Sequence, residues 1–144
     1  MKYFYVGPMD PGEFGDDIVM THDTRPPTVV KLDVSFEGYF GDALLEPFPC
    51  FIGTDVLVHA ILDRRLTGTE IAAVKTSIAD QYDSSYCKPE DIPHFHWLKI
   101  VGIAGLDDFG LAPKHKLVVS ERALNVLNSL GIENAEVEPY QRGK

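Results

Sequence analysis

The sequence of 144 residues has only two cysteines and no apolar run near the roughly 18 residues that a membrane-spanning helix needs. Cys50 and Cys87 lie far apart and no CxxC pair is present, so we expect two reduced thiols and no disulfide. The N-terminal segment lacks an apolar stretch of signal-peptide length and turns acidic at once. These absences predict a cytoplasmic protein that does not enter a membrane.

Motifs for phosphate binding and for common catalytic centres are also missing. Neither GxxxxGK[ST] nor GxGxxG occurs, so no glycine-rich phosphate loop is predicted. Asp16–Asp17 and Asp107–Asp108 are adjacent acids, but neighbouring side chains of an extended segment point apart, so neither pair forms a catalytic dyad. We therefore expect no enzymatic activity, no catalytic residue and no cofactor.

Histidine and cysteine are arranged in a way that leaves two other hypotheses open. His94 and His96 are two residues apart and would face the same side of an extended segment, as metal ligands can. No HExxH or paired CxxC element accompanies them, so we expect no bound metal. The further zinc ligands that such a site could recruit are Cys50, His59, Cys87 and His115. The alternative function is a small hydrolase or transferase in which Cys87 acts with His94 and His96.

Basic residues are few, and the acids are concentrated in the first third of the chain. The net charge is −9, and residues 1–49 hold nine acids against three bases. Such a surface repels nucleic acid and anionic lipid and attracts a basic partner. The alternative is that the acids serve solubility alone.

The length and the 44% hydrophobic content are typical of one globular domain spanning residues 1–144. Residues 2–7 are rich in β-formers, and residues 28–38 alternate between apolar and polar, with Val30, Leu32, Val34 and Phe36 on one face. Residues 8–27 are predicted to form a surface excursion, and residues 79–97 a long exposed loop.

Two stretches, residues 51–74 and 117–140, have the same layout of strand, helix cap, helix and strand. They align without a gap at an offset of 66 residues. Thr54 and Ser120 are predicted N-caps, Asp55 and Glu121 would follow them in the first helical turn, and Gly131 would end the second helix. The matching suggests a duplicated unit, although any two segments of this kind share some positions.

The last 34 residues before the C-terminal tail, "DDFGLAPKHKLVVSERALNVLNSLGIENAEVEPY", resemble the C-terminal signature of bacterial polymorphic-toxin immunity proteins. The first unit, "IGTDVLVHAILDRRLTGTEIAAV", looks like a related element of the same proteins. Together these stretches cover about a third of the chain. The paired CxxC motifs of some relatives are absent here, so no zinc site is implied. The resemblance is carried by Leu117, Val118, Val119, Ser120, Glu121, Leu124, Leu127, Gly131, Ile132, Glu136 and Pro139.

The resemblance implies a cytoplasmic inhibitor that neutralises a cognate antibacterial toxin domain by binding it. Many such toxins are basic, so an acidic surface would speed the encounter. We expect no contact with nucleic acid or membrane, and a homo-oligomer stays open. The expected partner-binding residues are Asp10, Glu13, Asp16, Asp17, Asp23, Tyr82, Tyr86, Phe95 and Trp97, the four aromatic side chains being exposed in the long loop.

The predicted fold is a single α+β domain. A mixed or mostly antiparallel sheet would be covered on one side by two short helices, at Thr54–Arg65 and Ser120–Leu130. A third functional hypothesis, a regulatory module that binds a small ligand, would be detected by ligand-induced stabilisation.

Overall fold

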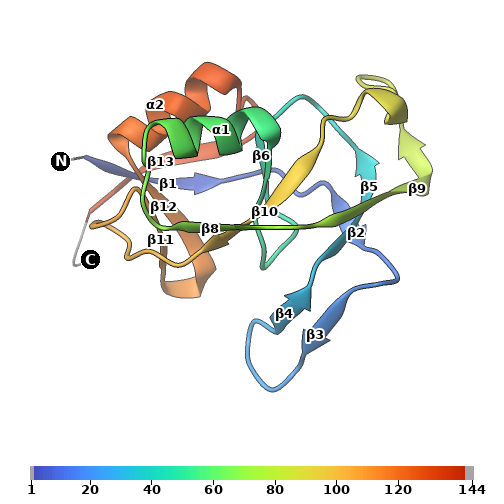
Figure 1. Cartoon of the computed structure of the whole chain (residues 1–144), viewed down its shortest axis with the longest axis horizontal. Helices are drawn as coiled ribbons and strands as arrows, with labels where there is room; N and C mark the ends of the chain where they lie inside the picture. The colour runs from blue at the N-terminus through green and yellow to red at the C-terminus, as the bar shows by residue number, and fades with distance from the viewer. Residues whose placement is uncertain (1, 142–144) are drawn as a thin grey trace.

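Two helices lie side by side over two four-stranded sheets (Figure 1). The computed structural model describes residues 2–141. Helix α1 spans Asp55–Asp63 and helix α2 spans Glu121–Leu130. The predicted α+β class is confirmed, and the domain is single and compact. The strands form four sheets where one was expected.

The first four-stranded sheet is antiparallel and contains both chain ends that the structure describes. Its order is β11 (Phe109–Ala112), β12 (Lys116–Ser120), β1 (Tyr3–Gly7) and β13 (Glu136–Tyr140). The second is also antiparallel, in the order β6 (Leu44–Leu45), β7 (Ile52–Thr54), β10 (Phe95–Ile100) and β8 (Thr69–Ala72).

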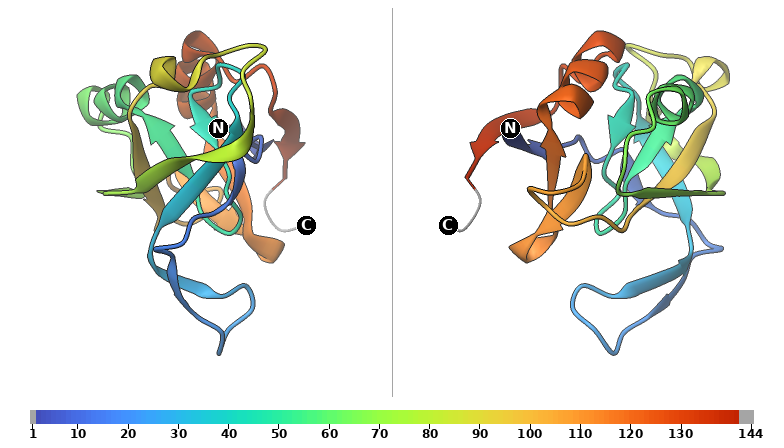
Figure 2. Two further views of the ribbon diagram at one scale, coloured as in Figure 1. Left: turned by 90° about the vertical axis from the view of Figure 1, so that its right-hand side faces the viewer. Right: turned by 60° about the vertical axis from the view of Figure 1, so that its left-hand side comes forward.

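The remaining strands carry the acidic part of the chain. A three-stranded sheet has the order β2 (Gly12–Phe14), β5 (Asp33–Gly38) and β9 (Lys75–Asp83), with β5 and β9 parallel. Strands β3 (Val19–Thr21) and β4 (Thr28–Lys31) form a hairpin that projects from the body (Figures 1 and 2). Short 3-10 turns occupy Pro89–Asp91 and Pro113–His115.

Both predicted helix caps are confirmed. The Thr54 side chain accepts a hydrogen bond from the Leu57 backbone N–H at 3.3 Å, and that of Ser120 accepts one from Ala123 at 3.2 Å. Each bond satisfies a backbone donor that the first helical turn leaves free. Gly131 ends α2 with a positive φ of 104°, a conformation that suits glycine.

The offset of 66 residues also relates the two four-stranded sheets. In each sheet the strand before the helix and the strand after it flank a third, antiparallel strand, which is β10 in one and β1 in the other. Even the registers agree: Trp97 lies opposite Ile52 and Ala72, and Tyr5 lies opposite Val118 and Glu138. The sequence similarity of the two units is therefore matched by a common arrangement of strands.

Each unit also holds the loop that follows the helix of the other. Asp108, just before β11, accepts the Thr67 backbone N–H at 2.9 Å, after α1. Asp42, just before β6, accepts the Asn134 backbone N–H at 3.1 Å, after α2. Both carboxylates are buried, so these bonds tie the two halves together within the core.

The core has two parts. One lies beneath the helices and includes Leu57, Ile61, Leu127 and Phe109. The other lies between β5, β7 and β10 and is described below with the aromatic residues. Burial of side chains of this size contributes roughly 1.5–3 kcal/mol each relative to exposure, so the two parts fix how the surface segments are presented.

Two expectations about strands need correction. In residues 28–38, Leu32, Val34 and Phe36 are buried as predicted, but Val30 is exposed because β4 belongs to the projecting hairpin. The predicted loop 79–97 is shorter, since β9 continues to Asp83 and β10 begins at Phe95.

Candidate functional site

The surface segment from residue 10 to residue 23, here called the acidic arm, carries five acids and no lysine or arginine. It includes β2, β3 and the loop between them. All five side chains are exposed, as predicted: Asp10, Glu13, Asp16, Asp17 and Asp23. The structure therefore displays the excess charge along one continuous stretch of chain.

The arm is held to the body at its middle. The Gly15 N–H donates to the Asp33 backbone oxygen and the Asp17 N–H donates to the Asp33 carboxylate, both at 2.9 Å. The Asp17 carboxylate also forms an ion pair with Lys75 of β9, which lowers the pKa of Asp17. A side chain at Gly15 would collide with the Asp33 carboxylate, so glycine permits this close approach. Of the five acids, Asp17 thus has a structural role as well.

Glu46 connects the arm to the body and gives a test of its electrostatics. Burial, followed by the negative charge of Asp10, raises the pKa of Glu46 to about 7. The free energy of unfolding should therefore fall as pH rises from about 4.5 to 7, because ionising Glu46 is harder in the folded state.

We expect Glu46→Gln to stabilise the protein by about 1–2 kcal/mol at pH 8 and to have little effect at pH 5. Urea unfolding at both pH values measures this. Equal effects at the two pH values would show that Glu46 titrates normally.

Two of the four aromatic candidates are not exposed, which corrects the prediction. Phe95 is 2% exposed and Trp97 is 8% exposed, because both point from β10 into the core between β5 and β7. Tyr82 is half-buried and its hydroxyl donates to the Cys87 backbone oxygen at 2.9 Å. Tyr86 is 67% exposed and stays available for a partner.

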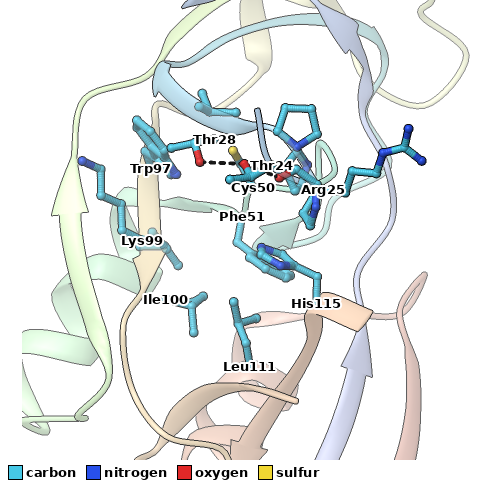
Figure 3. Close-up of a pocket in the computed structure, with 15 residues that line it drawn as sticks. Thr24, Arg25, Thr28, Cys50, Phe51, Trp97, Lys99, Ile100, Leu111 and His115 are labelled. Atoms are coloured by element: carbon cyan, nitrogen blue, oxygen red, sulfur yellow. Dashed lines mark hydrogen bonds between the residues drawn. The ribbon is translucent and has the colours of Figure 1, made fainter. Parts of the chain in front are cut away.

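A groove of about 490 Å³ lies beside the projecting hairpin, where no local sequence pattern predicted one. Figure 3 shows Trp97 and Lys99 of β10 on one side and His115 on the other. The Lys99 ammonium lies 4.5 Å from the centre of the Trp97 ring, a cation–π arrangement. Residues 24–29 of the hairpin complete the wall, with Arg25 among them and no acid in the lining. The groove thus adjoins the acidic arm but differs from it in charge.

The predicted cluster of Cys87, His94 and His96 does not assemble. His94 and His96 do face the same way, but the group between them is the carboxylate of Asp55. The Cys87 thiol instead donates to the Lys88 backbone oxygen, and burial together with nearby Asp91 raises the pKa of that thiol. A raised pKa disfavours the thiolate that nucleophilic catalysis requires.

The proposed zinc recruits are also placed elsewhere. Cys50 is buried in the core, where burial raises its thiol pKa to about 12. Within residues 2–141, Asp55, His94 and His96 are the only group of three metal-ligating side chains that converge. Sequence reasoning assigned Asp55 to the first turn of α1 and missed its pairing with residues about 40 positions later.

Comparison with known proteins gives no family assignment. No family model, no curated protein and no solved structure matches this chain. In the part of the chain that the structure describes, no helix has both the length and the apolar content to cross a membrane.

Proposed function

We propose that this protein is an immunity protein that neutralises a cognate, basic toxin domain by binding it directly. The observation that carries the proposal is the acidic arm, whose five acids are exposed on a segment fixed to a rigid body. A fixed array of like charges steers an oppositely charged partner and speeds the encounter. The proposal also rests on the resemblance of the two strand–helix–strand units to immunity proteins.

The groove supplies what charge alone does not. Affinity in protein complexes comes from a few anchors that enter concave, desolvated pockets. The groove adjoins the arm through the β3–β4 hairpin, so one partner can engage both surfaces. Arm and groove then form one binding face, with long-range attraction from the arm and close packing in the groove.

A growth assay tests this function. The chain is expressed together with the protein encoded next to it, in cells that this protein alone kills or arrests. We expect growth to be restored. Cells that remain arrested although the chain is folded and abundant would contradict the proposal.

A further inference from the structure

We propose that Asp55, His94 and His96 form a binding site for one divalent transition-metal ion, with zinc as the best-suited ion. This proposal replaces the expectation of no bound metal. It concerns residues outside the acidic arm and the groove, so it stands independently of the proposed function.

The backbone brings the three side chains together on rigid elements. Strand β10 pairs with β7 in a register that sets Phe95 opposite Thr54 and His96 opposite Gly53. The Asp55 N–H donates to the His94 backbone oxygen at 3.2 Å, which fixes the start of α1 beside the start of β10. Because alternate residues of a strand face the same side, His94 and His96 both point to Asp55 while Phe95 points into the core.

The distances fit a small metal ion. The His94 Nδ1 atom lies 3.0 Å from the Asp55 Oδ1 atom, and His96 Nε2 is hydrogen-bonded to the same oxygen. The three ligand atoms lie within 4.8 Å of one another. Ligands of tetrahedral zinc are about 3.3–3.5 Å apart, since each is about 2.0–2.2 Å from the ion. Small rotations of exposed side chains would therefore open the cluster around an ion.

The chemistry of the ligands selects the kind of ion. Two imidazoles and one carboxylate are borderline ligands that suit zinc and its neighbours, whereas magnesium and calcium prefer oxygen alone. The two imidazole rings are 4.7 Å apart and nearly perpendicular, at 84°. If both rings were protonated, two positive charges would share one carboxylate. A metal ion with two neutral imidazoles avoids this repulsion.

The site leaves room for a further ligand. The His94 side chain is 69% exposed and that of Asp55 is 50% exposed, so the cluster opens to solvent on one side. Three protein ligands with an open fourth position are the pattern of zinc sites that hold water or an added group. The positive end of the α1 dipole opposes a cation here, and the Asp55 carboxylate offsets it.

Calorimetric titration of zinc chloride into the untagged, chelator-treated full chain tests the site. We expect one zinc ion per chain. His94→Ala and His96→Ala should each weaken zinc binding at least ~10-fold. Asp55→Asn should weaken it as well, since it keeps the shape and removes the charge. The matched control is His22→Ala, which removes one exposed histidine at the projecting hairpin and should bind like the wild type.

A second readout locates the metal without relying on affinity. In nitrogen-15 spectra of the histidine side chains, zinc should shift the imidazole signals of His94 and His96 and leave that of His22 unchanged. Thermal unfolding without zinc checks that the variants are folded. The proposal is overturned if the wild type shows no stoichiometric binding, or if His94→Ala and His96→Ala both bind as tightly as the wild type.

Discussion

Replacing Asp108 by alanine is expected to lower the free energy of unfolding by about 3 kcal/mol. This buried carboxylate accepts hydrogen bonds from the Ser120 hydroxyl at 2.6 Å, the Thr67 N–H at 2.9 Å and the Arg122 guanidinium at 2.6 Å. Its removal would leave the Ser120 and Thr67 donors without an acceptor in the core. Urea unfolding of the variant measures the loss.

Asp42 provides the matched comparison, because it has the equivalent place before β6 but no cationic partner. Burial raises the pKa of Asp42, against hydrogen bonds from Asn134 that lower it. We expect Asp42→Asn to change the free energy of unfolding by less than about 1 kcal/mol and Asp108→Asn to cost about 3 kcal/mol. Equal costs would show that Arg122 contributes nothing specific at Asp108.

The two carboxylates should also respond to acid in opposite directions. Burial tends to raise the pKa of Asp108, but hydrogen bonds from Arg122, Ser120 and Thr67 outweigh it and lower the pKa to about 2. Since this folded-state pKa is below the ordinary 3.8, the stabilisation by Asp108 is present above pH 4 and is lost as pH falls towards 2. Asp42, with its raised pKa, becomes less unfavourable over the same range.

Reversing three charges of the acidic arm should slow binding to the toxin domain at least ~10-fold. The variant combines Glu13→Lys, Asp16→Lys and Asp23→Lys. These side chains are exposed and make no hydrogen bond or ion pair among the described residues, so the fold should tolerate the change. Asp17 is spared because its ion pair with Lys75 holds the arm.

Stopped-flow association at several salt concentrations measures this effect. The wild-type rate should fall steeply with added salt, and the variant rate should be slow and nearly independent of salt. The control makes the same charge change outside the arm, through Asp80→Lys, Glu90→Lys and Glu133→Lys. If both triple variants slow binding equally, overall charge rather than the arm steers the partner.

Local sequence patterns were sufficient for the elements whose signals are local. Thr54, Ser120 and Gly131 marked three helix ends because capping depends on residues within one turn. The alternation from Leu32 to Phe36 marked β5 for the same reason. The expected exposure of all five acids held because charged side chains are seldom buried without a partner.

Features that depend on pairing across the chain were missed. The polar and proline-rich surroundings of Phe95 and Trp97 indicated a loop, although both side chains pack in the core once β10 pairs with β7. Asp55 meets His94 only through that same pairing. The groove exists because the β3–β4 hairpin stands beside β10, which no window of sequence shows.

Co-purification of this chain with the protein encoded beside it tests the central claim most directly. Both are produced in the same cells, and size-exclusion chromatography with light scattering gives the mass of whatever they form. Direct neutralisation predicts a stable complex with one copy of each chain, and its loss when the arm carries the three reversed charges. Cells that survive while the two proteins elute separately at all concentrations would contradict it.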